Sequence, residues 1–294
     1  MSLTYALITP ARNEEANVEG VIRSVLAQSV PPLKWIIVSD GSTDRTDQIV
    51  EAYSRSCEFI ELTRLPGARD RNFAAKVACF NAGYDLLNGI DYDIIGNLDA
   101  DITFAPDYFE YLLARFAENP KLGVGGTPFI ENGQQYDYRF TNIEHVSGAC
   151  QLFRRKCFED IGGYRPIRGG GIDWVAVTTA RMRGWQTRTF TGTSCFHHRK
   201  IGTGDAGSLF VHFKQGQKDY ALGNHPLWQA FRAAYQLAQK PYGIRGLLLL
   251  SGYMWSSATG KERHIPADLM GFVRGEQLRR LKQLLGSNEA KNVL

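Results

Sequence analysis

Apolar stretches of two different periods alternate along the first 130 residues, and this alternation limits the possible folds more than any other feature of the chain. Runs of strand length lie at 3–9, 35–39, 58–63 and 93–98, and amphipathic helical patterns follow them at 18–26, 43–53, 73–87 and 107–116. Strands and helices at this spacing predict an α/β fold with a mixed, mostly parallel sheet and helices on both faces. Ligands bind beyond the carboxyl ends of such strands, so the loops after Thr9, Ser39 and Leu98 are expected to line one site.

The pattern becomes irregular after about residue 120. A strand at 123–130, a helix at 175–182 and a strand at 187–196 are expected there. Residues 205–294 are richer in helical patterns, with aromatic residues interleaved with Lys and Arg. We therefore predict two domains, an α/β domain at 1–204 and a basic, aromatic-rich helical extension at 205–294.

Charge is distributed unevenly along the chain. Residues 1–195 carry 20 Lys and Arg against 24 Asp and Glu, a net charge of −4, whereas residues 196–294 carry 14 against 6, a net charge of +8. An anionic partner is therefore expected at the C-terminal part, and a diphosphate, an anionic lipid surface and nucleic acid all suit its charge. No nucleic-acid-binding module is recognisable, so nucleic acid is not an expected partner.

The cysteines and the hydropathy pattern indicate a cytoplasmic protein. The chain has five cysteines, which is an odd number, and they are widely spaced without a CxxC pair, so reduced thiols are expected rather than disulfides or a zinc site. No apolar run reaches about 18 residues, and the N-terminus has no basic leader. Neither a spanning helix nor a signal peptide is therefore expected.

Two carboxylates follow the fourth predicted strand. Asp99 and Asp101 stand two residues apart, and in an extended segment their side chains would point to the same side. Two like charges so close repel each other unless a cation lies near them. Mg²⁺ and Mn²⁺ prefer such oxygen ligands, and Mg²⁺ usually completes its shell with water and substrate phosphates. The spacing therefore indicates a divalent cation at this edge of the sheet.

Polar loops also follow the first two predicted strands. Residues 10–15 read PARNEE and residues 40–44 read DGSTD, and either one alone is an ordinary turn with a helix cap. Together with KVACFNAG at 76–83 and DAD at 99–101, their order and spacing resemble those of family 2 glycosyltransferases of the GT-A fold. The resemblance extends over roughly the first 200 residues, with a nucleotide-sugar half at about 1–120 and an acceptor half at about 121–204.

The resemblance implies roles for individual residues. Substrate would contact Pro10, Ala11, Arg12, Asn13, Glu14, Asp40, Ser42, Lys76, Asn81, Asp99, Ala100, Gly148, Ala149, Trp174 and Arg199. Among these, Asp40 would lie near the base of the nucleotide and Asp99 near the ribose or the metal. For Lys76 an ordinary solvated helix position is an equally good interpretation.

The resemblance also implies a metal site with Mn²⁺ or Mg²⁺. Asp101 would bind the cation that bridges the two phosphates of the donor, and a His after the strand at 187–196 would complete its shell. His197 and His198 are adjacent and would point to opposite faces of a strand, so only one can face the site. We favour His198.

The resemblance also implies that Asp173 is the general base, since residues 170–174 stand where the family usually has a Glu-Asp pair before a helix. A carboxylate within reach of an acceptor hydroxyl can remove its proton. It is also suited to cap the helix that follows, and the two roles are compatible. Ile172 stands where the family usually has a Glu, which leaves the acceptor contacts open. The Gln-x-x-Arg-Trp segment and the long membrane spans of processive synthases are missing from this sequence, so addition of a single sugar is expected.

The function implied is metal-assisted transfer, with inversion, of one sugar from a nucleoside-diphosphate sugar to a hydroxyl of a glycan or a lipid-linked saccharide, in cell-envelope polysaccharide biosynthesis. Two alternatives stay open. Ile172 is compatible with a non-catalytic, nucleotide-binding scaffold on the same fold. A sugar nucleotidyltransferase would instead need a Gly-rich, Arg-containing loop where residues 10–14 read PARNE. Residues 205–294 would either pack on the sheet domain or contact the inner face of the membrane.

Overall fold

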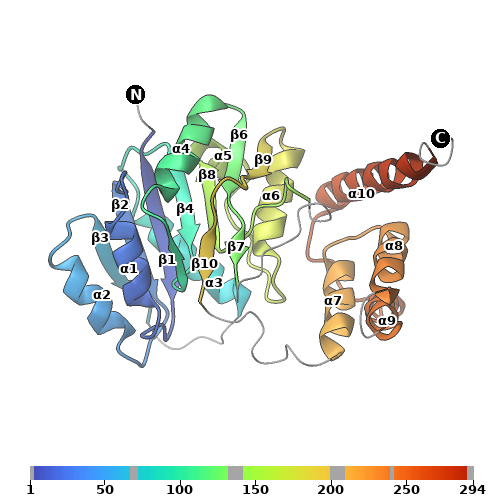
Figure 1. Ribbon diagram of the computed structural model, residues 1–294. Helices are drawn as coiled ribbons and strands as arrows, with labels where there is room; N and C mark the ends of the chain where they lie inside the picture. The colour runs from blue at the N-terminus through green and yellow to red at the C-terminus, as the bar shows by residue number, and fades with distance from the viewer. Residues whose placement is uncertain (1–2, 67–71, 132–141, 199–208, 239–241, 290–294) are drawn as a thin grey trace. The chain divides into compact units, whose positions relative to one another are not determined.

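The computed structural model describes residues 3–66, 72–131, 142–198, 209–238 and 242–289 (Figure 1). The chain divides into two compact units, residues 1–200 and residues 201–294. The first unit contains the strands and the second is helical.

A seven-stranded mixed sheet with the order β3-β2-β1-β4-β8-β6-β9 forms the centre of the first unit. Its strands are β1 (Tyr5–Ala11), β2 (Lys34–Ser39), β3 (Ile60–Arg64), β4 (Ile94–Leu98), β6 (Leu122–Gly126), β8 (Cys150–Arg154) and β9 (Gln186–Thr189). β1 pairs in parallel with β2 and β4, whereas β8 runs antiparallel to both of its neighbours. The predicted α/β fold with a mixed, mostly parallel sheet is therefore confirmed.

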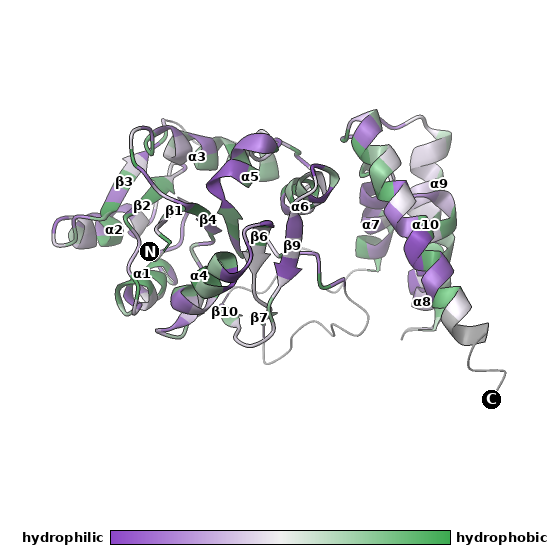
Figure 2. Ribbon diagram, turned by 90° about the horizontal axis from the view of Figure 1, so that it is seen from above, coloured by the Kyte–Doolittle hydropathy of each residue, from purple (hydrophilic) through white to green (hydrophobic). Residues whose placement is uncertain are grey.

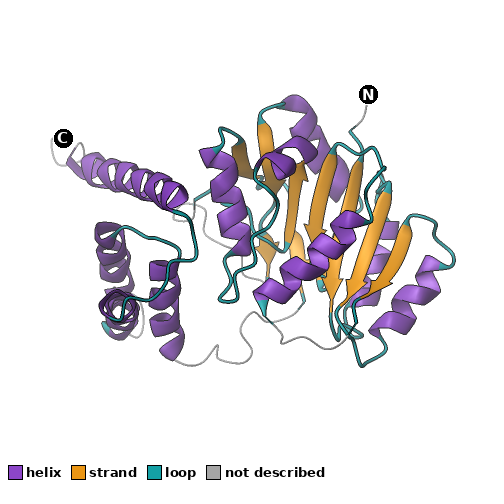
Figure 3. Cartoon of the chain, turned by 180° about the vertical axis from the view of Figure 1, so that it is seen from behind, coloured by secondary structure: helices purple, strands orange, loops and turns teal. Residues whose placement is uncertain are grey.

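Helices cover both faces of this sheet. Figure 2 shows α3 (Phe73–Asp85), α5 (Arg155–Asp160) and α6 (Ile172–Met182) on one side, with α1 (Val18–Leu26) and α4 (Tyr108–Glu118) on the other. The same layers can be followed from behind in Figure 3. Val50 of α2 (Thr46–Ser54) joins the hydrophobic cluster on the α1 and α4 side.

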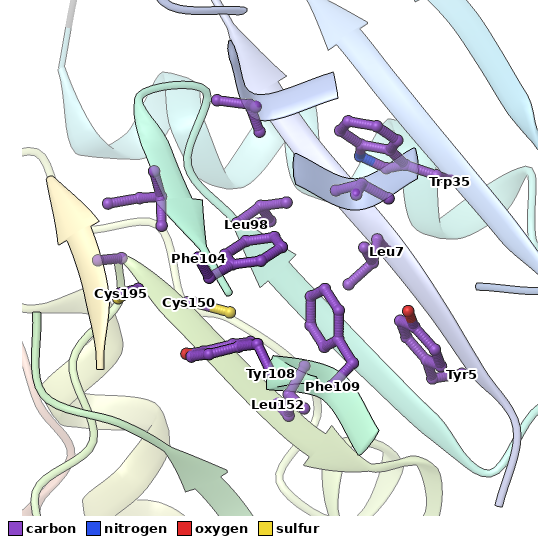
Figure 4. Packing of buried hydrophobic residues seen from close by; sticks show 14 of the residues in the cluster. Tyr5, Leu7, Trp35, Leu98, Phe104, Tyr108, Phe109, Cys150, Leu152 and Cys195 are labelled. Carbon is purple, nitrogen blue, oxygen red and sulfur yellow. The ribbon is translucent and has the colours of Figure 1, made fainter. Parts of the chain in front are cut away.

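Alternation along β1 supplies side chains to both faces. Tyr5 and Leu7 pack into the cluster beneath α1 and α4, where the ring centroids of Tyr5 and Phe109 lie 4.8 Å apart (Figure 4). On the other face α3 lies close to the sheet, because a Cβ at Gly83 would be only 2.8 Å from Cγ2 of Ile8. The glycine of the 76–83 motif therefore permits the close approach of α3 to β1.

A second, three-stranded sheet differs from the predicted pattern. The strand expected at 123–130 is divided into β6 and β7 (Phe129–Ile130), and the strand expected at 187–196 is divided into β9 and β10 (Cys195–His197). β10 pairs with β7 and with β5 (Ile102–Phe104) to form the small sheet. The prediction of one continuous strand was therefore wrong in both places, because the chain turns from the large sheet into the small sheet within each of these two ranges.

The second unit contains α7 (Phe210–Ala221), α8 (Pro226–Leu237), α9 (Ile244–Ala258) and α10 (Ala267–Glu289). α7 and α9 touch backbone to backbone, because a Cβ at Gly216 or at Gly252 would lie 2.0 Å from a carbonyl oxygen of the other helix. The predicted helical character of this part is confirmed. In the described ranges, no helix has the length and apolar composition needed to cross a membrane.

Candidate active site

The carboxyl ends of β1, β2 and β4 lie next to one another because these three strands are parallel neighbours. Ala11 pairs with Ser39, and the N–H of Asp40 donates to the carbonyl of Ala11 at 2.9 Å. The loops that follow the three strands therefore meet at one edge of the sheet. Most of the residues predicted from the strand-end motifs lie there.

Asp40 is a buried carboxylate with an open acceptor. It is only 5% exposed, and its Oδ2 lies 3.6 Å from a guanidinium nitrogen of Arg12. Within the described part of the chain, no donor reaches its other oxygen, Oδ1. Buried acceptors are normally satisfied in folded proteins, so Oδ1 is suited to an N–H or O–H group of a ligand.

The first two loops are held together by hydrogen bonds between them. The N–H of Asn13 donates to Oγ of Ser42 at 3.2 Å, and the N–H of Thr43 donates to Oδ1 of Asn13 at 2.8 Å. Asn13 has a positive φ of 54°, which Asn tolerates better than most residues. The N–H of Glu14 donates to Oγ1 of Thr46 at 2.7 Å. These side chains fix the loops that carry Arg12 and Asp40.

Lys76 and Asp99 form an ion pair at the end of β4. Nζ of Lys76 donates to Oδ1 of Asp99 at 2.5 Å, and each side chain is about one quarter exposed. The Lys is thus tied to the strand-end motif across 23 residues of sequence, and it is not simply a solvated helix residue.

Asn97 links this pair to the neighbouring loop. Its Nδ2 donates to Oδ1 of Asp99 at 3.3 Å and to the carbonyl of Gly148 at 2.7 Å. The N–H of Asp99 in turn donates to the carbonyl of Ala149 at 2.9 Å. The end of β4 and the 148–149 segment therefore form one hydrogen-bonded unit.

Asp173 lies against the same segment. It stands in the first turn of α6, and its Oδ2 accepts from the N–H of Gly148 at 3.3 Å. A Cβ at residue 148 would lie 3.0 Å from Cβ of Asp173. The pKa of the Tyr164 hydroxyl is well above its ordinary value, mainly because the ring is buried and further because of the charges of Asp173 and Asp99. The charges of both carboxylates thus raise the pKa of the same buried tyrosine hydroxyl.

Asp101 contacts a different set of groups from Asp99. Ala100 and Asp101 form the turn from β4 to β5, so the expected extended segment with both carboxylates on one side does not occur. Asp101 is 6% exposed, and its Oδ2 lies 3.5 Å from Nε2 of His197.

The structure brings His197 to Asp101, and His198 has another partner. His197 pairs with Ile102 across the small sheet, whereas Nε2 of His198 lies 2.7 Å from Oγ1 of Thr103. Adjacent strand residues point to opposite faces, so the two imidazoles have different neighbours, and His198 as the metal ligand stays a prediction. His197 is therefore the histidine positioned beside the candidate metal ligand Asp101.

Several other predicted residues have different surroundings. Ala11, Ala100 and Ala149 place their side chains in the hydrophobic cluster, so only their backbones can face a ligand. Asn81 is exposed and lies about 140° around α3 from Lys76, so the structure does not bring the two together. Pro10 and Trp174 are half-buried, and Arg199 lies outside the described residues.

The sequence interpretation missed the polar layer beneath the loops. It contains Asn97, Gln151 and Tyr164, where the Tyr164 hydroxyl donates to Oε1 of Gln151 at 2.6 Å and Asn97 pairs with Gln151 across the sheet. The available signal was a polar residue among the apolar residues of each of two strands, since buried polar groups need partners.

Comparisons with known proteins agree with the resemblance read from the motifs. Residues 6–143 match the family model described as glycosyl transferase family 2. The chain is 27% identical over 174 residues to poly-β-1,6-N-acetyl-D-glucosamine synthase of Staphylococcus epidermidis, covering 51% of this chain and 39% of that protein. It is 28% identical over 246 residues to the probable glycosyltransferase YdaM of Bacillus subtilis, covering 80% of this chain and 50% of that protein. The chain thus spans half or less of the length of these two relatives.

Solved structures support the fold. The mannosyltransferase PcManGT of Pyrobaculum calidifontis, in complex with GDP-Man and Mn²⁺, matches with a TM-score of 0.59 and 18% identity, covering 100% of this chain and 81% of that chain. S. aureus TarS in complex with UDP-GlcNAc matches with a TM-score of 0.59 and 12% identity, covering 92% of this chain and 78% of that chain. Residues 6–143 are therefore similar to glycosyl transferase family 2, and the fold of the N-terminal unit is of the GT-A type.

Proposed function

We propose that the protein transfers a single sugar from a nucleoside-diphosphate sugar to a hydroxyl acceptor, with inversion at the anomeric carbon. The observation that carries this proposal is a continuous series of hydrogen bonds. It runs from Lys76 and Asp99 through Asn97 and Gly148 to Asp173. It joins the donor side of the site to a carboxylate suited to act as a base.

The donor would bind at the ends of β1, β2 and β4. Oδ1 of Asp40 would accept an N–H of the nucleobase, while Arg12 lies beside the other oxygen of that carboxylate. Lys76 and Asp99 would face the ribose and the diphosphate. Relatives and solved neighbours are named for N-acetylglucosamine polymers or contain UDP-GlcNAc or GDP-Man, so a UDP- or GDP-hexose is the donor class that we propose.

Asp101 and His197 fit a divalent cation. They offer one carboxylate oxygen and one imidazole nitrogen 3.5 Å apart, and both side chains are about nine-tenths buried. Within the described ranges no group of three or more His, Cys, Asp and Glu residues could hold a metal ion, so water and the diphosphate would supply the remaining ligands. Since Mg²⁺ takes oxygen ligands and an imidazole favours a transition metal, we propose Mn²⁺ over Mg²⁺.

The chemistry would be a single displacement. The Asp173 carboxylate takes the proton of the acceptor hydroxyl while the hydroxyl oxygen forms its bond to the anomeric carbon. The bond from that carbon to the diphosphate oxygen breaks, and the electron pair leaves with the nucleoside diphosphate. A bound divalent cation supplies charge stabilisation for this leaving group. The acceptor oxygen attacks from the face opposite the leaving diphosphate, and this inverts the anomeric centre.

The acceptor that we propose is a glycan or a lipid-linked saccharide of the cell envelope, reached at the cytoplasmic face of the membrane. Support comes from α9, whose exposed stripe carries Ile244, Leu247, Met254 and Trp255, while Gly252 and Tyr253 of the opposite side are buried. Trp255 is 59% exposed and Leu247 is 63% exposed. An apolar stripe on a unit whose residues 201–294 carry 12 Lys and Arg against 6 Asp and Glu suits an anionic lipid surface.

Sedimentation with vesicles containing anionic lipid tests the membrane contact. The double variant Leu247→Ser and Trp255→Ser is expected to weaken vesicle binding about fivefold or more. It lacks the two apolar side chains that would enter the boundary between lipid headgroups and acyl chains. Leu33→Ser serves as the control, since Leu33 is an exposed leucine of the other unit. Unchanged sedimentation of the double variant would contradict the proposed contact.

Asp173→Asn tests the transfer itself. Turnover of the donor, measured as release of nucleoside diphosphate, is expected to fall by about 10³-fold or more, while nucleotide binding stays intact. Asp107→Asn is the control, because Asp107 precedes α4 as an exposed carboxylate at a helix start. Nucleotide binding with unchanged turnover in Asp173→Asn would reject the base, and nucleotide binding without any turnover of the wild type would favour the scaffold.

A further inference from the structure

The side-chain amide of Asn97 joins the two halves of the candidate site. Asn97 is 2% exposed within β4, and its Nδ2 reaches both Oδ1 of Asp99 and the carbonyl of Gly148. An NH₂ group carries two N–H donors, one for each acceptor. Neither a carboxylate nor an apolar side chain of similar size can make this pair of bonds.

Gly148 passes this contact on to Asp173. Its carbonyl accepts from Asn97 at 2.7 Å, and its N–H donates to Oδ2 of Asp173 at 3.3 Å. Because there is no Cβ at residue 148, the Asp173 side chain lies directly against the backbone. A shift of Gly148 would therefore move the hydrogen bond that holds the Asp173 carboxylate.

We propose that Asn97 is a positioning residue that sets the place of Asp173 relative to Asp99 through the backbone of Gly148. This inference rests on the proposed function, in which Asp173 is the base and Asp99 faces the donor. Asn97 does not need to touch the substrate. A buried amide is costly unless it is hydrogen-bonded, and its bonds here all serve groups of the site.

Asn97→Ala removes both donors. The expected result is a fall in kcat for donor turnover of about 10- to 100-fold, because a misplaced reacting group slows the chemical step more than it weakens binding. The KM for the donor is expected to stay within about threefold. Hydrogen–deuterium exchange of the 147–149 segment is expected to become faster, and this measurement does not require an identified donor.

The matched control is Tyr108→Phe. Tyr108 of α4 is also fully buried, but its hydroxyl lies 2.9 Å from Oγ1 of Thr127 on the other face of the sheet, in the cluster beneath α1 and α4. This variant is expected to melt at a lower temperature with kcat and the exchange of 147–149 unchanged. It separates loss of stability from loss of positioning.

Asn97→Asp adds a pH readout. Its ionised side chain would repel Asp99 and the Gly148 carbonyl, whereas its protonated form regains one O–H donor for that carbonyl. In the described part of the chain, the charged or titratable groups linked to this position are Lys76 of α3, Asp99, Cys150, Tyr164 and Asp173. The turnover of Asn97→Asp relative to wild type is expected to rise as pH falls, whereas the ratio for Asn97→Ala stays flat.

Two outcomes would overturn the inference. In the first, Asn97→Ala melts earlier but keeps its kcat and its exchange at 147–149, which would give Asn97 a purely structural role. In the second, the relative turnover of Asn97→Asp is independent of pH. If the wild type binds and turns over no nucleotide sugar, the proposed function fails instead, and the exchange measurement still decides whether Asn97 holds Gly148.

Discussion

The N–H of Gly148 donates to Oδ2 of Asp173 at 3.3 Å, and a Cβ on residue 148 would lie 3.0 Å from Cβ of that aspartate. Only a glycine allows the carboxylate to lie so close to this loop. Contacts of 3.0–3.4 Å force a neighbour to move by a few tenths of an ångström, so the position of Asp173 depends directly on the absence of a side chain here.

Gly148→Ala is therefore expected to lower donor turnover by about 10- to 100-fold, since small displacements of a reacting group have effects of this size. Nucleotide affinity should change little, because Asp40 and Lys76 are not displaced. Gly169→Ala is the matched control, as nothing lies within 4 Å of its added Cβ. Steady-state kinetics of the two variants checks this, and equal turnover in both would contradict it.

His197 and His198 should differ in their effect on metal binding. His197→Ala removes the imidazole beside Asp101 and is expected to raise the Mn²⁺ concentration for half-maximal thermal stabilisation, measured with a nucleoside diphosphate present, by about 10-fold or more. His198→Ala should leave this concentration unchanged because His198 contacts Thr103. A larger effect of His198→Ala would restore the assignment made from the sequence.

Lys76→Met should weaken donor binding. The charge-assisted contact with Asp99 orders the end of β4, and loss of the cation is expected to raise the Kd for the nucleotide sugar about 10-fold. Lys34→Met is a close control, since Lys34 forms a 2.6 Å ion pair with Glu61 and is 23% exposed, against 25% for Lys76. Calorimetric titration should show no change for Lys34→Met, and similar values for both variants would argue against a donor role.

Arg232→Met should destabilise the helical unit. Asp219 is almost fully buried and accepts from Arg232 at 2.6 Å and from Gln229 at 3.1 Å. Loss of the cation leaves a buried carboxylate without its charged partner, at a free-energy cost of about 2 kcal/mol, reduced because Arg232 is one-third exposed. Urea unfolding measures this change in the free energy of unfolding. Arg279→Met is the control, because Arg279 is exposed. Equal stability of both variants would show that the pair contributes little.

Buried thiols should make stability fall at alkaline pH. Burial raises the pKa of Cys195 from its ordinary value of 9.0 to about 11, so the folded state keeps a proton that the unfolded state loses. This contribution is complete below pH 9.0 and disappears as the pH rises through 11. Between pH 8 and 10 the wild type is expected to lose about 1 kcal/mol more than Cys195→Ala, measured by urea unfolding. Parallel losses would contradict the prediction.

The sequence alone determined the alternation of strands and helices, the parallel edge and the motifs at the ends of β1, β2 and β4. These features are local, because hydrophobic period and turn chemistry act over a few residues. The family resemblance followed from the same motifs, and the match of residues 6–143 to the family model agrees with it.

Only the tertiary structure decided which histidine faces Asp101 and which buried amide links Asp99 to Asp173. His197 and His198 are equivalent in the sequence, and the pairing of β10 with β5, residues 95 positions apart, chooses between them. In the sequence, Asn97 is only a polar residue inside an apolar strand. Its role becomes visible when the fold places Gly148, 51 residues later, against its side chain. Such long-range contacts depend on packing and register, which no local pattern encodes.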